Sequence, residues 1–139
     1  MALPAAPDTR ARPGPDRTVR ILTVDDQPGF RKAACSLVAG TAGFENAAET
    51  VDGESAIRLA RELDPDMVLV DVLMDGIDGI ETASRLIRED PTRLVVLVSS
   101  TDVSELSQLA ERAGVSAVVR KHWLSPRLLR GLWIALRRR

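Results

Sequence analysis

The chain has 139 residues, 45% of them hydrophobic, which is enough to bury the core of one ordinary domain. Its net charge is −1, but residues 1–119 carry 12 basic and 20 acidic groups, whereas residues 120–139 carry seven basic groups and no acidic one. An acidic body argues against broad nucleic-acid binding, and no apolar run approaches the ~18 residues of a membrane span. We therefore expect neither direct nucleic-acid binding nor membrane insertion.

The amino-terminal residues 1–18 are rich in proline and alanine and offer almost nothing to bury. This composition predicts a disordered leader, followed by a single domain over residues 19–139. The leader lacks the apolar stretch of a signal peptide. The single cysteine, Cys35, has no partner for an internal disulfide and lies among apolar residues, which predicts a small buried side chain in a reducing compartment. The expected location is the cytoplasm.

Two alternating periods of apolar residues follow the leader. Five short apolar runs have the character of strands: 19–24 (VRILTV), 44–51, 67–70 (MVLV), 94–98 (LVVLV) and 115–119 (VSAVV). After each run, apolar residues recur with helical spacing: 30–38, 56–63, 80–87, 103–113 and 128–136. Three of these helices begin with typical caps: Asp78 with Glu81, Asp102 with Glu105, and Ser125 before Pro126.

Strict alternation of strands and helices predicts an α/β fold, in which a parallel sheet is covered by helices on both faces. In such sheets, ligands bind beyond the carboxyl ends of the strands. Four of the five predicted strands deliver a polar group at that edge: Asp25 and Asp26 after the first, Asp71 after the third, Ser99 after the fourth, and Lys121 after the fifth. These residues are therefore expected to form one site.

Three neighbouring carboxylates repel one another, so a bound cation is implied. Oxygen ligands without a cluster of His or Cys point to Mg²⁺, with Mn²⁺ as an alternative. A lysine and a hydroxyl beside such an ion are typical of phosphoryl transfer. Asp71 follows a wholly apolar strand near the centre of the predicted sheet, and it is the candidate nucleophile that would form an aspartyl phosphate.

Four motifs carry a resemblance to a known family: VDD at 24–26, DVLMDGIDG at 71–79, LVSS at 97–100 and RK at 120–121. In this order and spacing, the chain resembles the receiver domain of two-component response regulators from about residue 19 to residue 136. The resemblance implies a flavodoxin-like (βα)5 doubly wound parallel sheet with strand order 2-1-3-4-5. It also implies that residues 19–139 form a receiver domain.

The resemblance further implies a role for each site residue. Asp71 would accept a phosphoryl group from a histidine kinase or a phosphotransfer protein, Lys121 would pair with the phosphate, and Ser99 would donate its hydroxyl to it. The implied metal ligands are Asp26, Asp71, the backbone carbonyl of Leu73 and, through a water, Asp25. The phosphoacceptor would assist its own phosphorylation and dephosphorylation without being an enzyme that acts on an external substrate.

Four positions depart from the usual receiver pattern, of which Ser100 in place of a commoner alanine is a small change. Val118 stands where receivers often have the Tyr or Phe that moves with the switch hydroxyl, so the signalling movement is expected to be muted or carried by helix shifts. His122 replaces a common proline, which leaves a trans Lys121–His122 peptide in a re-routed loop or a strained cis one. Asp75 also replaces a common proline and is expected to face solvent.

The two tryptophans, Trp123 and Trp133, are expected to be buried against the last helix, with a partner surface as the alternative. The Trp and Leu content of the fourth helix, the fifth strand and the last helix permits dimerisation through these elements without requiring it. The same face, together with Ser99, is expected to bind a downstream protein when Asp71 is modified.

Two other functions compete with a phosphorylatable single-domain receiver. Val118 and His122 favour a phosphorylation-independent binding module that kept the fold and lost the switch. The opening motif VDDQPGFR favours a receiver fragment of a longer DNA-binding regulator. Because no output domain follows the last predicted helix, we expect any effect on transcription to pass through another protein.

Overall fold

The computed structural model describes residues 17–74, 78–100 and 106–137. Its centre is a parallel five-stranded sheet in the order β2-β1-β3-β4-β5. The strands are β1 (Val19–Val24), β2 (Phe44–Thr50), β3 (Met67–Asp71), β4 (Leu94–Ser99) and β5 (Ala117–Arg120). Fold class and strand order are therefore confirmed. The predicted leader stays a prediction, because residues 1–16 lie outside the described residues.

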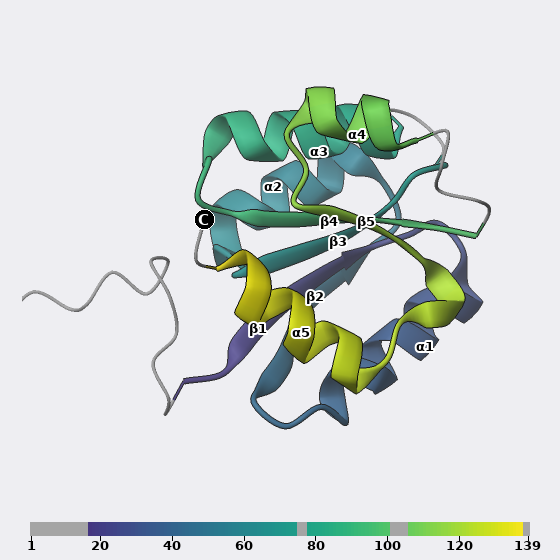
Figure 1. Ribbon diagram of the computed structural model, residues 1–139, viewed down its shortest axis with the longest axis vertical. Coiled ribbons are helices and arrows are strands. Elements are labelled where there is room, and N and C mark those ends of the chain that lie inside the picture. The colour runs from purple at the N-terminus through teal and green to yellow at the C-terminus, as the bar shows by residue number, and fades with distance from the viewer. Residues whose placement is uncertain (1–16, 75–77, 101–105, 138–139) are drawn as a thin grey trace, which may run out of the picture.

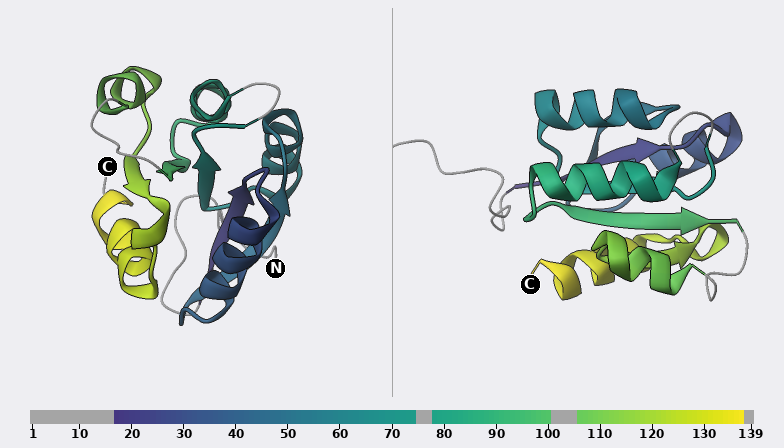
Figure 2. Two further views of the ribbon diagram at one scale, coloured as in Figure 1. Left: turned by 90° about the vertical axis from the view of Figure 1, so that its right-hand side faces the viewer. Right: turned by 90° about the horizontal axis from the view of Figure 1, so that it is seen from above.

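Helices cover both faces of the sheet. They are α1 (Pro28–Ala39), α2 (Gly53–Leu63), α3 (Gly79–Glu89), α4 (Ser107–Ala113) and α5 (Pro126–Leu136). Figures 1 and 2 show α2, α3 and α4 on one side of the sheet and α1 and α5 on the other. In the part of the chain that is described, none of these helices has the length and apolar character needed to cross a membrane.

The central strands alternate their side chains between two cores. Val68 and Val70 of β3 pack with the helices α2 and α3, while Met67 and Leu69 of the same strand pack with α1 and α5. All five residues of β3 are buried, as are all six of β4. Burial on both faces explains why these two strands show no polar alternation in the sequence.

The predicted caps of α3 and α5 are confirmed. Asp78 Oδ1 accepts a hydrogen bond from the Glu81 backbone N–H at 2.8 Å, and Ser125 Oγ accepts one from the Leu128 N–H at 3.0 Å. Each bond satisfies one of the backbone donors that a helix leaves free in its first turn. The cap predicted from Asp102 and Glu105 falls on residues 101–105, outside the described residues.

The last strand begins two residues later than the sequence pattern predicts, at Ala117 instead of residue 115. The cause is the end of α4. Gly114 adopts a left-handed conformation with φ 79°, and the Val115 N–H donates to the Ala110 carbonyl at 3.1 Å. This six-to-one bond is the Schellman ending of a helix, so Val115 completes α4 instead of joining the sheet.

Burial was predicted correctly for Trp133 and wrongly for Trp123. Trp133 is 9% exposed and packs in the core beneath α5, whereas Trp123 is 60% exposed. Residues Lys121–Trp123 form one tight 3₁₀ turn, and this turn directs Lys121 inward. The Trp123 ring lies instead beside the Arg120 guanidinium, 5.7 Å from the ring centroid. Cys35 is likewise half-buried rather than buried.

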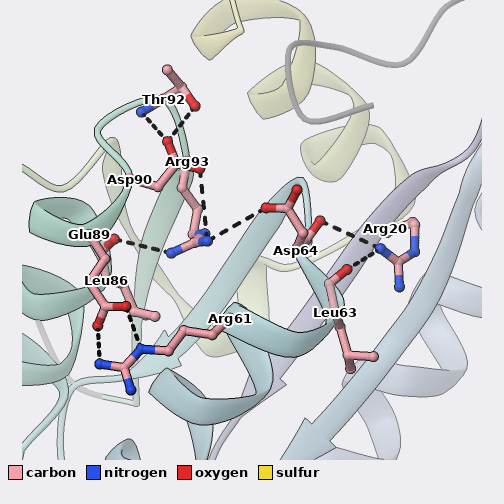
Figure 3. A network of polar contacts seen from close by, with 9 residues as sticks. All are labelled: Arg20, Arg61, Leu63, Asp64, Leu86, Glu89, Asp90, Thr92 and Arg93. Atoms are coloured by element: carbon pink, nitrogen blue, oxygen red, sulfur yellow. Dashed lines mark hydrogen bonds and ion pairs between the residues drawn. The ribbon is translucent and has the colours of Figure 1, made fainter. Parts of the chain in front are cut away.

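A polar network joins the elements at the amino ends of the strands (Figure 3). Arg93, just before β4, is 9% exposed and donates to the Leu86 carbonyl at 3.2 Å. The same guanidinium lies 3.6 Å from Asp64 and 3.8 Å from Asp90. Arg93 thus connects the ends of α2 and α3 to the start of β4, at the opposite edge of the sheet from the predicted site.

Candidate functional site

The pairing of β1 with β3 brings two of the predicted acidic residues together. Val24 pairs with Val70, so Asp25 and Asp71 lie at neighbouring strand ends. Together with Asp26 they offer one carboxylate oxygen each, all within 4.8 Å of one another. Asp25 is fully buried, Asp71 is 5% exposed, and Asp26 is half-buried. The structure therefore places all three predicted carboxylates in one cluster, with access from the side of Asp26.

Lys121, which directly follows the edge strand β5, completes the cluster. Its ammonium Nζ lies 2.6 Å from Asp25 Oδ2 and 3.6 Å from Asp71 Oδ2. The side chain reaches these partners because the turn after β5 directs it inward, where it is 9% exposed. One buried ammonium thus faces three carboxylates, so the cluster keeps a surplus of negative charge.

The pKa of Asp71 reflects this surplus of negative charge. Burial, followed by the charge of Asp25, raises the pKa of Asp71 from 3.8 to about 6, and Asp26 adds to the effect. Lys121 and the Leu73 backbone N–H, which donates to Asp71 Oδ1 at 3.3 Å, act in the opposite direction. A cation between the carboxylates would relieve the repulsion that raises this pKa.

The donor set fits a hard divalent cation. All three groups are carboxylates, and oxygen ligands of this kind suit Mg²⁺ or Mn²⁺ better than zinc. Mg²⁺ commonly takes one or two protein carboxylates and completes its shell with water and phosphate oxygens. The metal role predicted for the Leu73 carbonyl stays a prediction; the Leu73 side chain itself is exposed.

A close backbone contact holds Asp71 in place. The Gly79 N–H, at the start of α3, donates to the Val72 carbonyl at 3.0 Å. A Cβ atom at position 79 would lie 1.9 Å from the Asp71 carbonyl oxygen, a distance that no side chain can occupy. Glycine at this position therefore lets α3 begin directly against the backbone of the candidate phosphoacceptor.

The two predicted switch residues lie on adjacent strands. Ser99 ends β4, is 4% exposed and pairs in register with Arg120, the neighbour of Lys121. Val118 pairs with Leu97 and packs against the core on the side of α2 and α3. The peptide between Lys121 and His122 is trans, which is the first of the two predicted alternatives.

Three residues of α1 and its cap contact the cluster without having been predicted. Gln27 Oε1 accepts a hydrogen bond from Lys121 Nζ at 3.0 Å, and the Phe30 ring centroid lies 4.5 Å from the same nitrogen. Arg31 donates to the Asp25 carbonyl at 2.8 Å and pairs with Glu49 at 3.0 Å. The sequence feature that could have identified these three residues is their position in or just before the first turn of a helix that follows two acidic residues.

Comparison with known proteins gives one consistent result. The family model described as "Response regulator receiver domain" matches residues 21–132. The transcriptional regulatory protein LiaR of Bacillus subtilis (strain 168) is 33% identical over 104 residues, which are 73% of this chain and 49% of that protein. A protein-glutamate methylesterase/protein-glutamine glutaminase of Anaeromyxobacter dehalogenans (strain 2CP-C) is 40% identical over 87 residues, 63% of this chain and 26% of that protein.

Solved structures agree in fold. The crystal structure of a two-component response regulator of the LuxR family from Aurantimonas sp. SI85-9A1 has a TM-score of 0.78 and 31% identity, covering 88% of this chain and 87% of that one. The chain spans about half or less of the length of the curated relatives described above. The similarity therefore concerns the part that these longer proteins share with it.

Proposed function

Because the chain belongs to the family of response regulator receiver domains, we propose that it accepts a phosphoryl group on Asp71 and thereby changes its binding to a protein partner. The observation that carries the proposal is the cluster of Asp25, Asp26 and Asp71 within 4.8 Å, with Lys121 Nζ 3.6 Å from Asp71. The proposed donor is the phosphohistidine of a histidine kinase or a phosphotransfer protein, and the proposed location is the cytoplasm.

In the proposed reaction, a carboxylate oxygen of Asp71 attacks phosphorus while the bond from phosphorus to the histidine nitrogen breaks. The electron pair of that bond stays on the imidazole, which takes up a proton. The residues proposed to hold Mg²⁺ or Mn²⁺ are Asp26, Asp71, Leu73 through its carbonyl, and Asp25 behind a water. When bound, the cation supplies positive charge beside the phosphoryl oxygens.

Two side chains of the protein complete the proposed chemistry. Lys121 pairs with a phosphoryl oxygen, which requires its ammonium to move from Asp25 toward the group on Asp71. Ser99 donates its hydroxyl to another phosphoryl oxygen. Because Ser99 ends β4 next to Arg120 of β5, a movement of Ser99 is transmitted to the face built by α4, β5 and α5.

This face is the proposed binding surface for a downstream protein, and it is also the proposed surface for a homodimer. The relatives carry different outputs beyond the shared part: one is named a transcriptional regulatory protein, another a methylesterase and glutaminase. These names describe longer proteins, of which this chain matches about half or less, so we carry neither output over to it.

The proposal predicts that radiolabelled acetyl phosphate will label the protein only when Mg²⁺ or Mn²⁺ is present, and that Asp71→Asn will abolish labelling. Asp52→Asn is the matched control: Asp52 follows β2 at the same edge of the sheet, outside the carboxylate cluster. Asn caps α2 as well as Asp does, so this variant should fold and be labelled like the wild type. Equal labelling of the wild type and Asp71→Asn would disprove the assignment.

One observation favours the second candidate function, a binding module that works without phosphorylation. Val118 is a partly buried aliphatic residue packed against the core, where the resemblance leads one to expect a mobile aromatic ring, and the chain has no tyrosine. If beryllofluoride with Mg²⁺, a mimic of the phosphoryl group, leaves the amide spectra of Ser99 and α4 unchanged, this candidate replaces the first.

A further inference from the structure

The contacts of Lys121 point to a positioning residue outside the acidic cluster. We propose that Gln27 holds the Lys121 ammonium on Asp25 in the resting site and has to release it before Lys121 can pair with a phosphoryl group on Asp71. The resting contact rests on described geometry alone. Its consequence for phosphorylation rests on the proposed function.

Three distances show where the ammonium lies. Lys121 Nζ is 2.6 Å from Asp25 Oδ2 and 3.0 Å from Gln27 Oε1, but 3.6 Å from Asp71 Oδ2. The contact with Asp25 is an ion pair, and the contact with Gln27 is a hydrogen bond that the ammonium donates. Lys121 is therefore bound mainly by Asp25 and Gln27, and only loosely by the candidate phosphoacceptor.

Gln27 occupies a position that glutamine rarely suits. It is the N-cap of α1, where Ser, Thr, Asp or Asn normally accepts a bond from the first turn, and its side chain makes no such bond. Instead, its backbone N–H donates to Asp25 Oδ1 at 2.8 Å and its side-chain oxygen accepts from Lys121. These two contacts of Gln27 are with residues of the site, which accounts for the poor cap.

Phe30 closes the same side of the ammonium. Its ring lies one helical turn after Gln27 on α1, with its centroid 4.5 Å from Lys121 Nζ. A ring at this distance attracts a cation through its negative face. Gln27 and Phe30 therefore form a cradle that draws Lys121 toward α1 and away from Asp71.

The proposal predicts effects of opposite sign for two substitutions. Gln27→Leu removes the acceptor, so the resting position of Lys121 loses a hydrogen bond and the phosphoryl-bound position becomes relatively more stable. Gln27→Glu places a negative charge at the same distance, so Lys121 is held more firmly in the resting position. Ser36, exposed on α1 and outside the proposed binding face, provides controls for both changes in the variants Ser36→Leu and Ser36→Glu.

The resting contact is tested by NMR on the metal-free protein. The Phe30 ring shifts the ε-methylene protons of Lys121 upfield, and Gln27→Leu should move these signals toward the values of a free lysine. Ser36→Leu should leave them in place. Identical Lys121 shifts in the two variants would overturn the proposal, whether or not the site takes a phosphoryl group.

The functional consequence is tested by titrating beryllofluoride in the presence of Mg²⁺ and measuring the bound species by fluorine NMR. Relative to wild type, we expect the midpoint to fall about three-fold in Gln27→Leu and to rise about three-fold in Gln27→Glu, the size of one modest hydrogen bond. Shifts in the same direction, or shifts matched by the Ser36 variants, would overturn the proposal. If the wild type binds no beryllofluoride, the proposed function fails, and the Lys121 signals alone decide whether Gln27 positions the lysine.

Discussion

At the scale of single residues, Asp71 shows how burial and charge act against each other. The carboxyl is 5% exposed and faces the buried carboxylate of Asp25, so its pKa is raised to about 6. Between pH 4 and 6 the folded protein therefore keeps a proton that the unfolded chain has already released. The free energy of unfolding falls as the pH rises through this window, and the loss remains above pH 6.

This sign gives a prediction for the metal-free protein. Asp71→Asn carries no charge to bury, so at pH 7.5 it should exceed the wild type in the free energy of unfolding by on the order of 2 kcal/mol. The difference should become negligible near pH ~3, below both pKa values, where Asp71 is protonated in the folded and the unfolded state. Urea denaturation at the two pH values measures both quantities.

Asp52→Asn serves as the control in that experiment. The Ser55 backbone N–H and hydroxyl lower the pKa of Asp52, so its charge favours the fold instead of opposing it. This variant should not gain stability at pH 7.5. A wild type as stable as Asp71→Asn at both pH values would show that the Asp71 carboxylate is not under electrostatic stress.

At the scale of elements, the start of α3 fixes the position of Asp71. Gly79→Ala would place a methyl group against the backbone of Asp71 and Val72, so that α3 or the loop after β3 must shift. We expect a loss of about 2 kcal/mol in the free energy of unfolding, typical of overpacking, together with weaker phosphorylation.

Gly131→Ala is the matched control for this substitution. Gly131 lies within α5, and a Cβ there would meet no atom within 4 Å. Because alanine is the better helix former, this variant should gain up to about 1 kcal/mol. If Gly79→Ala is as stable and as active as Gly131→Ala, the close contact at the start of α3 does not constrain the site.

The elements also show what a sequence pattern can predict. Parallel strands place their carboxyl ends at one edge, so Asp25, Asp71 and Lys121 could be expected together from their positions after apolar runs. The start of β5 could not, because it depends on the hydrogen bond by which Val115 completes α4. The exposure of Trp123 was missed for a similar reason, since one tight turn decides which of its side chains points inward.

Side-chain contacts across the sheet are a further limit of sequence reasoning. Gln27 and Lys121 are 94 residues apart, and no periodicity relates them. Only the inward direction of Lys121, combined with the start of α1 beside β1, brings the two together. Gln27 could be flagged from the sequence as a poor helix cap, but its partner could not be named.

At the scale of the whole molecule, the polar network around Arg93 and the candidate site lie at opposite ends of the strands. Arg93 connects α2, α3 and β4 at the amino ends of the strands (Figure 3), whereas the carboxylates lie at the carboxyl ends. Arg93→Met should lower the free energy of unfolding by about 2 kcal/mol, because it leaves Asp64 and Asp90 without their buried partner. Divalent-cation affinity, measured where the variant is folded, should not change.

Arg61→Met tests the same network at an exposed pair. Arg61 forms two hydrogen bonds with Glu89, at 2.6 and 2.9 Å, but its side chain is 65% exposed. Because water screens such a pair, the denaturation midpoint should stay close to that of the wild type. Equal losses in Arg93→Met and Arg61→Met would show that burial does not set the contribution of Arg93.

The central claim is that carboxylates from two neighbouring strand ends share one divalent cation, which makes Asp71 a phosphoryl acceptor. Calorimetric titration with Mg²⁺ tests it most directly, using the wild type, Asp71→Asn and Asp52→Asn. We predict one bound ion in the wild type and in Asp52→Asn, and binding weakened about ten-fold or more in Asp71→Asn. A wild type that binds no ion at millimolar Mg²⁺, or an Asp71→Asn variant that binds as tightly as the wild type, would contradict the account.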